Sequence, residues 1–272
     1  MAFALVLGLA RRARTFVPAL MLGVGLAPVL GPTDVRAEDD PDAEVSQPPS
    51  ATERTTREIW SGAETHGHVW AFYSGVTAAA DGLHAPGLRF RLSAGMSTYA
   101  YVDALGKARA AQPFADLLAG YQWQVGSLTV KGFAGATGYA DFRPTEQVAN
   151  VWDLWGQRRI GAKGVLEGWW TIDPRHWASL DLAYATPQAS LWSRARVGHR
   201  LLPQFSLGAE AGSAGEVARP TARAGVFVRY DWADGEVALS GGIADKGRSG
   251  LAPDVGMRNA TPYATLLWLQ RF

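Results

Sequence analysis

The 272-residue chain contains no cysteine. This absence excludes a disulfide scaffold, a thiolate metal site and a cysteine nucleophile. An excess of one charge is also lacking, because 26 Lys and Arg stand against 25 Asp and Glu. Nucleic-acid-binding domains usually carry a basic surplus, so nucleic acid is not an expected partner.

The sequence has no GxSxG, HExxH or phosphate-loop motif, and we expect no catalytic site, no metal site and no cofactor.

Long apolar runs are scarce as well. Phe16–Leu30 is an apolar run of 15 residues, shorter than the roughly 20 residues of a membrane-spanning helix. Arginines precede this run, and Val35-Arg36-Ala37 offers small residues at positions −3 and −1 of a cleavage site. Residues 1–37 therefore predict a cleaved secretory signal peptide, with a retained signal anchor as the alternative.

The chain after the predicted signal peptide divides into two parts. Residues 38–57 are rich in acidic residues, Pro, Ser and Thr, which predicts a disordered leader because little apolar surface is there to bury. Residues 58–272 carry the remaining pattern and form the predicted folded domain. The whole chain has 31 glycines and 11 tryptophans at a mean hydropathy of −0.05, and its glycine share exceeds the average of about 7%.

The folded domain lacks the 3.6-residue period of amphipathic helices and alternates with period two instead. In Thr221–Trp232, apolar residues such as Val226 and Val228 fall on one face, and Arg223 and Arg229 fall on the other. A soluble β-sandwich would also alternate. A sandwich core, however, could not hold unpaired charges of both signs, whereas the lumen of a closed membrane barrel tolerates them.

The pattern predicts an all-β, antiparallel transmembrane β-barrel. Aromatic residues gather near strand ends, as in the interfacial girdles of outer-membrane barrels. The predicted girdle comprises Trp60, Trp70, Tyr121, Trp123, Trp169, Trp170, Trp177, Tyr230, Trp232 and Trp268. Twelve strands are expected, with ten or fourteen as alternatives. They are placed at residues 58–64, 68–78, 88–101, 113–125, 128–142, 158–172, 176–187, 190–202, 205–217, 221–232, 235–246 and 261–272.

Connections are expected to alternate between short periplasmic turns and longer external loops. The longer loops are predicted at Asp103–Gln112, Arg143–Gln157 and Gly247–Ala260. The last strand resembles those of outer-membrane barrels in ending on an aromatic residue, with apolar residues at alternate positions before it. Trp268 and Phe272 are the core of this membrane-insertion signature, and the barrel-assembly machinery is its expected partner.

Several segments in order along the chain resemble the BcsS family of alphaproteobacterial cellulose biosynthesis proteins. They are Glu58–Glu64, Tyr73–Gly75, Gly87–Arg91, Leu117–Trp123, Leu128–Gly135, Glu167–Trp170, Trp177–Leu182, Leu207–Gly212, Arg223–Trp232, Leu239–Gly242 and Tyr263–Phe272. The resemblance implies an outer-membrane protein of a Gram-negative bacterium that is linked to cellulose synthesis or secretion. It supplies no catalytic motif, so it points to a pathway rather than to a mechanism.

Charged residues are predicted to line the lumen, with eight basic residues against five acidic ones. They are Arg89, Arg91, Lys131, Lys163, Glu167, Asp181, Arg194, Arg196, Glu210, Arg223, Arg229, Asp231 and Glu236. The first interpretation is a ladder of cross-strand ion pairs that fills a narrow lumen. The second is a small channel with weak anion preference, or a groove for sugar hydroxyls with inward aromatic residues such as Phe133, Trp169, Trp192 and Phe227.

The leading functional hypothesis is a non-enzymatic outer-membrane accessory of cellulose production, as a narrow pore or as an attachment point for the glucan. The expected partners are membrane lipid, the glucan and the cellulose-synthase machinery. The alternatives are a lipid-modifying outer-membrane enzyme and a purely structural barrel with a plugged lumen. An enzyme of that kind needs a nucleophile with a histidine base. His66 and His68 are interpreted as loop residues, and His199 as an interfacial residue on the lipid face near the periplasmic rim.

Overall fold

The computed structural model describes residues 55–67, 69–103, 106–142, 158–217, 220–245 and 260–272. The predicted signal peptide, most of the predicted leader and His68 lie outside these residues. The predicted external loops at residues 143–157 and 247–259 lie outside them too. No helix within the described segments is long and apolar enough to cross a membrane.

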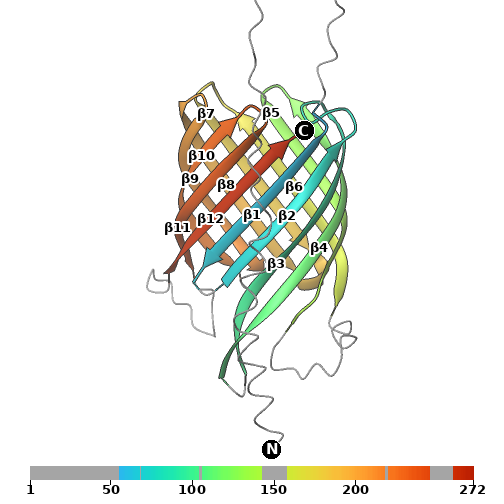
Figure 1. The fold of residues 1–272 in the computed structure, drawn as a ribbon, viewed down its shortest axis with the longest axis vertical. Helices are drawn as coiled ribbons and strands as arrows, with labels where there is room; N and C mark the ends of the chain where they lie inside the picture. Colours follow the sequence, from blue (N-terminus) through green and yellow to red (C-terminus); the bar gives the residue numbers. More distant parts are fainter. Residues whose placement is uncertain (1–54, 68, 104–105, 143–157, 218–219, 246–259) are drawn as a thin grey trace, which may run out of the picture. The chain divides into compact units, whose positions relative to one another are not determined.

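Twelve antiparallel strands form a closed barrel in which every strand pairs with its sequence neighbours and β1 pairs with β12 (Figure 1). The predicted transmembrane barrel and its number of strands are therefore confirmed. The strands are β1 (Arg57–His66), β2 (Val69–Ala79), β3 (Gly87–Asp103), β4 (Gly106–Val125), β5 (Leu128–Tyr139), β6 (Arg159–Thr171), β7 (His176–Ala185), β8 (Ser190–Leu202), β9 (Phe205–Glu216), β10 (Thr221–Trp232), β11 (Gly235–Asp245) and β12 (Ala260–Arg271). A short 3₁₀ helix, η1 (Thr186–Gln188), joins β7 to β8.

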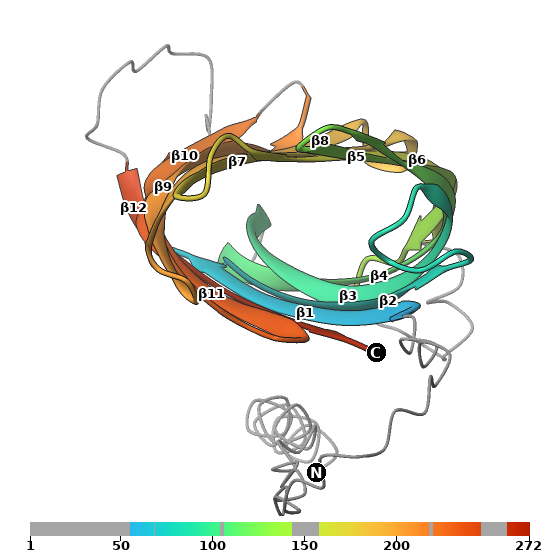
Figure 2. The ribbon, with the colours of Figure 1, turned by 90° about the horizontal axis from the view of Figure 1, so that it is seen from above.

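The barrel closes through the two ends of its chain. The β1–β12 register runs from the pair Glu58 and Arg271 to the pair His66 and Tyr263. Next to the pair Glu58 and Arg271, the backbone N–H of Arg57 donates to the carbonyl of Phe272. The N–H of Phe272 donates to the carbonyl of Arg57 at 2.8 Å. Closure leaves no unpaired sheet edge, which is the condition for a β-structure within lipid. Seen along its axis, the ring of strands has an oval outline (Figure 2).

The strand connections at the two ends of the barrel differ. The turns Ala80–Pro86, Gly126–Ser127, Ile172–Arg175, Pro203–Gln204 and Ala233–Asp234 lie at the end that also holds Phe272, which we call the turn end. At the opposite end, which we call the loop end, η1 joins β7 to β8. The β3–β4 hairpin projects beyond the other strands there (Figure 1).

One predicted loop is wrong. Residues of the expected loop Asp103–Gln112 belong to β4 from Gly106 onward, and the paired hairpin continues to Asp103 opposite Gly106. The segment around residues 104–111 is rich in alanine. Alanine does not distinguish an apolar face from a polar one, so no period-two pattern marks this strand extension.

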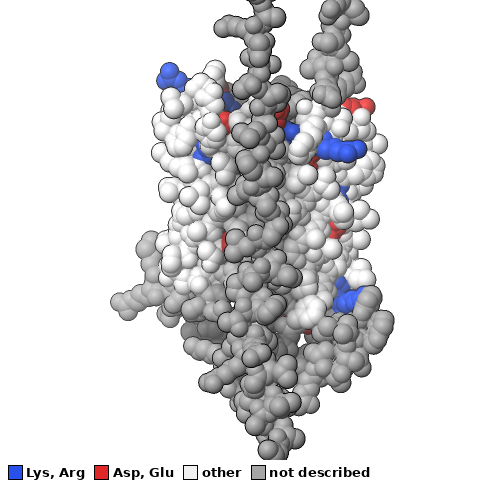
Figure 3. Space-filling view, viewed as in Figure 1, with Lys and Arg blue, Asp and Glu red and all other residues white. Residues whose placement is uncertain are grey.

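The alternating strands expose their apolar side chains and bury their polar ones, which is the reverse of a soluble protein. On β3, the side chains of Leu88, Phe90 and Leu92 are more than half exposed, whereas Arg89 and Arg91 are buried. The outer face is therefore apolar and the inner face polar, as in transmembrane barrels. The described surface in Figure 3 is accordingly mostly uncharged.

Glycine makes room for large rings inside the barrel. A Cβ atom at Gly208 would collide with the backbone carbonyl of Val197 and the ring of Phe227. A Cβ atom at Gly198 would collide with the indole of Trp177 in the same way. Both rings are about 1% exposed. Part of the glycine excess thus reflects the close packing of aromatic side chains over the inner face of the sheet.

Candidate functional site

The inner face of β7, β8 and β9 carries ion pairs between neighbouring strands. Arg194 on β8 contacts Asp181 on β7 at 2.9 Å, and Arg196 on β8 contacts Glu210 on β9 at 2.8 Å. Glu210 also accepts hydrogen bonds from Ser240 on β11 and Tyr263 on β12. The Glu210 carboxylate is 4% exposed, and its several donors satisfy it as a buried charge requires.

Other ion pairs on the inner face join strands that do not pair with each other in the sheet. Arg91 on β3 forms a bidentate pair with Glu167 on β6, at 2.6 and 3.0 Å. Lys163 on β6 contacts Asp116 on β4 at 2.6 Å. Along the barrel wall, two strands lie between Arg91 and Glu167, and one strand lies between Lys163 and Asp116. Such pairs connect parts of the wall that backbone hydrogen bonds between neighbouring strands do not connect directly.

Two further pairs connect β1 with the rest of the barrel. Arg223 on β10 contacts Glu64 at 2.7 Å, and Lys131 on β5 lies 3.8 Å from Glu58. Glu64 and Glu58 lie on the same face of β1. The first strand thus supplies two carboxylates to the interior, and each meets a cation from a different side of the ring.

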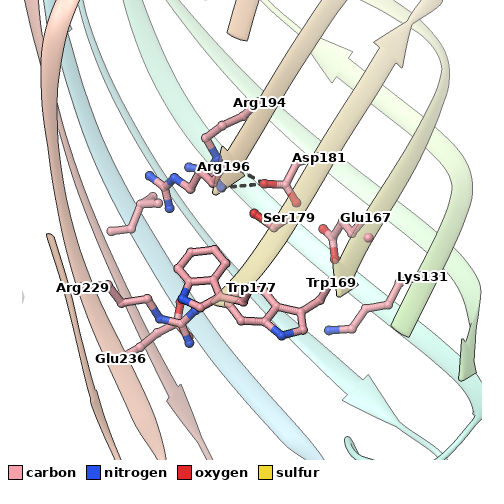
Figure 4. Close-up of a pocket in the computed structure, with 12 residues that line it drawn as sticks. Lys131, Glu167, Trp169, Trp177, Ser179, Asp181, Arg194, Arg196, Arg229 and Glu236 are labelled. Atoms are coloured by element: carbon pink, nitrogen blue, oxygen red, sulfur yellow. Dashed lines mark hydrogen bonds and ion pairs between the residues drawn. The ribbon is translucent and has the colours of Figure 1, made fainter. Parts of the chain in front are cut away.

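Aromatic rings and guanidinium groups fill the turn-end half of the lumen. Trp169 on β6 and Trp177 on β7 stack with ring centroids 4.3 Å apart. The guanidinium of Arg229 on β10 lies 4.6 Å from the Trp169 ring, and it also forms ion pairs with Asp231 and Glu236. Figure 4 shows this layer beside the layer of Asp181, Arg194 and Arg196. Cation–π contacts of this geometry are favourable where water is displaced.

The turn Ala80–Pro86 covers part of the lumen at the turn end. Arg89 is 1% exposed and donates to the carbonyls of Gly82, Leu83 and Ala85 in this turn. Gln122 on β4 donates to the carbonyl of Leu83 at 3.2 Å. The Leu83 side chain is itself 7% exposed. Arg89 is thus the residue of the predicted charged set that binds backbone oxygens rather than a carboxylate.

A cavity lies between these layers. The cavity lined by Trp169, Trp177, Asp181, Arg194 and Glu236, among others, has a volume of about 170 Å³. Ordinary ligand pockets have volumes of roughly 300–1,000 Å³. The cavity therefore has room for a few water molecules, which its charged lining would bind.

The structure brings twelve of the thirteen charged residues of the predicted set into ion pairs, and Arg89 binds the turn. Sequence reasoning missed three acidic partners, Glu58, Glu64 and Asp116. Their signal was present, since Glu58 and Glu64 alternate with the outward Ile59 and Ala63. Sequence reasoning also missed Arg271, which lies opposite Glu58 and 3.6 Å from Glu236. Adding the three acids to the predicted five, and Arg271 to the predicted eight basic residues, gives eight acids against nine basic residues. The basic surplus that suggested an anion preference falls from three to one once these partners are counted.

The predicted aromatic girdle is wrong for three of its members. Trp177 is buried against Phe227, Trp169 stacks on Trp177, and the Trp60 ring lies 5.7 Å from the Arg91 guanidinium inside the barrel. Nearness to a strand end does not tell which face a residue occupies, and alternation places these three inward. Outward aromatic residues at the turn end are Tyr121, Trp123, Trp170, Tyr230 and Trp268, each 37–49% exposed. Phe272 is 59% exposed.

Comparison with known proteins decides the family. A family model described as "Cellulose biosynthesis protein BcsS" matches residues 59–269. The chain belongs to the BcsS family. The match spans β1 almost to the end of β12, so the family assignment applies to the barrel itself. No curated protein matches the chain.

Solved structures similar to this BcsS-family barrel are outer-membrane barrels. The KdgM porin is 10% identical, with 79% of this chain and 99% of that chain covered at a TM-score of 0.45. The translocator domain of the autotransporter NalP from Neisseria meningitidis is 14% identical, with 80% and 88% covered at 0.43. The outer membrane phospholipase A from Escherichia coli is 10% identical, with 79% and 92% covered at 0.38. At these identities the likeness concerns barrel architecture alone.

The Arg91–Glu167 pair yields a test of the interior network. Glu167→Gln leaves the Arg91 guanidinium, with 8% of its side chain exposed, without its carboxylate. Loss of one partner of a buried pair costs about 3–5 kcal/mol. We expect a cost near the lower end of that range, because the Glu167 side chain is 26% exposed. Urea unfolding in detergent micelles measures the change.

Asp231→Asn is the matched control, because Arg229 keeps Glu236 as its partner. We expect this variant to lose less than about 1 kcal/mol. Equal losses of unfolding free energy in the two variants would show that the Arg91–Glu167 pair contributes no more to stability than the Arg229–Asp231 pair.

Proposed function

We propose that this BcsS-family protein is a non-enzymatic accessory of cellulose biosynthesis that resides in the outer membrane after export through a cleaved signal peptide. Its lumen stays closed in the resting state. The barrel acts as a fixed attachment point at the outer membrane for the glucan or the cellulose-synthase machinery, and not as a conduit for the glucan chain.

The observation that carries this proposal is the set of ion pairs across the lumen. A β-glucan is a ribbon of linked sugar rings, so its passage requires a continuous channel at least one ring wide. The Arg91–Glu167 and Lys163–Asp116 pairs project into the lumen from β3, β4 and β6, and the Trp169–Trp177 stack lies further toward the turn end. A polymer would have to break several charge-assisted hydrogen bonds.

The loop end offers a surface on which attachment could occur. The β3–β4 hairpin extends beyond its neighbours and is braced where it leaves the barrel. Ala111 and Phe142 exchange backbone hydrogen bonds of 3.0 and 2.8 Å, and the Tyr99 hydroxyl donates to Asp141 at 2.7 Å. A braced hairpin loses little conformational entropy on contact with a partner, which favours binding.

Conductance in planar lipid bilayers separates a closed barrel from a narrow pore. We expect the native protein to give no steady ion steps, because cross-lumen pairs and aromatic rings block the path. A double variant, Arg91→Ala with Glu167→Ala, removes one cross-lumen bridge and is expected to give measurable current. Asp231→Asn serves as the control and should stay silent. Steady unitary steps from the native protein would contradict the closed-lumen proposal.

Deletion of the gene tests the accessory role in cells. We expect extracellular cellulose to fall in the deletion strain and to recover with the native gene. Recovery is also expected with the Arg91→Ala and Glu167→Ala double variant, provided that it inserts normally, because attachment does not use the lumen. Normal extracellular cellulose in the deletion strain would refute the role in cellulose production.

A further inference from the structure

Two histidines face each other on the outer surface of the barrel near the turn end. His176 on β7 and His199 on β8 are direct cross-strand partners. The Nδ1 atom of His199 lies 2.9 Å from the Nε2 atom of His176. The His176 side chain is 53% exposed. Directly opposed residues on one sheet face have their Cβ atoms about 5 Å apart, so both rings can reach a common point.

A fixed carboxylate orients one of these rings. The Oδ2 atom of Asp173 lies 2.8 Å from Nδ1 of His176. Its Oδ1 atom accepts hydrogen bonds from the backbone N–H groups of Arg175 and His176, at 2.7 and 2.8 Å. The carboxylate therefore cannot rotate freely. By holding the proton on Nδ1 of His176, it leaves the Nε2 lone pair directed at His199.

We propose that His176 and His199 form a binding site for a transition-metal cation of the zinc class. Zinc binds imidazole nitrogen at about 2.0–2.1 Å in a tetrahedral arrangement, so two such ligands lie roughly 3.3–3.4 Å apart. The two nitrogens lie 2.9 Å apart as hydrogen-bond partners, so the rings need to separate by only about 0.4–0.5 Å to bind a cation between them. A carboxylate that hydrogen-bonds the far nitrogen of a ligating histidine is the usual support of such sites.

Metal binding requires one proton to change place and none to leave. Without metal, the hydrogen bond from His176 to Asp173 leaves Nε2 of His176 as the acceptor of the proton on Nδ1 of His199. With metal, that proton resides on Nε2 of His199, and both facing nitrogens donate their lone pairs to the cation. Each imidazole remains neutral, which is the form that binds metal.

The protein supplies two ligands to this site. In the part of the chain that the structure describes, no group of three or more His, Asp or Glu residues converges on one point. The remaining coordination positions are open to water or to an anionic oxygen. Arg175 adjoins the site in the same turn, and Arg200 donates to the carbonyl of Pro174 at 3.0 Å. These two cations lower the affinity for the metal alone and favour an anionic oxygen as a further ligand.

Calorimetric titration of the full-chain protein in detergent micelles, without an affinity tag that contains histidine, tests the site with Zn²⁺ as the probe. We expect one Zn²⁺ per chain. His176→Gln and His199→Gln should abolish binding, and Asp173→Asn should weaken it about 10–100-fold. His84→Gln, in the turn Ala80–Pro86, is the matched control and should bind like the native protein. Heat-dependent gel mobility verifies that each variant is folded.

Electron paramagnetic resonance with Cu²⁺ supplies a second readout that does not depend on affinity. We expect coupling to two imidazole nitrogens in the native protein and to at most one in His199→Gln. Zn²⁺ binding that survives in the His176→Gln and His199→Gln double variant would overturn the proposal. Absence of Zn²⁺ binding by the folded native protein would overturn it as well.

Discussion

Closure of the sheet is the constraint on which the rest of the structure depends. Lipid offers no hydrogen-bond partners, so every backbone group of a strand within it must pair with a neighbouring strand. The pairing of β1 with β12, reinforced by the mutual hydrogen bonds of Arg57 and Phe272, completes this requirement. Closure gives the wall an outside and an inside, and period-two alternation then sends Leu88 to lipid and Arg89 to the lumen. A mean hydropathy near zero is the average of these two faces.

The interior that closure creates must be filled, and it is filled with charge. Twelve strands enclose a narrow space, and the charged side chains that enter it meet partners from several strands rather than from one neighbour. Arg91 reaches Glu167, Lys163 reaches Asp116, and Arg223 reaches Glu64. Tryptophans stacked under Arg229 occupy the turn-end half. The proposal of attachment rather than transport depends on these same contacts, which project into the lumen.

Much of the fold could be predicted from the sequence, because period-two alternation is a local property that neighbouring residues reveal. The strand at Thr221–Trp232 has the same bounds in the sequence pattern and in the structure. The extension of β4 could not be found, since its alanines show no polarity. The inward position of Glu58 and Glu64 could have been predicted from their alternation with Ile59 and Ala63. Their ion-pair partners could not, because these lie on strands far away in sequence and no local spacing reports such a contact. The inward position of Trp177 was likewise obscured by its place at a strand end.

The opposition of His176 and His199 depends on the β7–β8 register, which a strand prediction accurate to one or two residues does not supply.

The lack of native cysteine allows the closed lumen to be tested directly. Thr265 on β12 is 2% exposed, and its hydroxyl has no hydrogen-bond partner among the described residues, so Thr265→Cys should perturb the interior little. The measurement is the rate at which a charged, membrane-impermeant thiol reagent modifies this cysteine in the folded barrel, compared with Asp234→Cys in an exposed turn. A closed lumen predicts that Thr265→Cys reacts only as fast as the barrel unfolds. A rate equal to that of Asp234→Cys would contradict the account, because the reagent would then have an open path to the middle of the lumen.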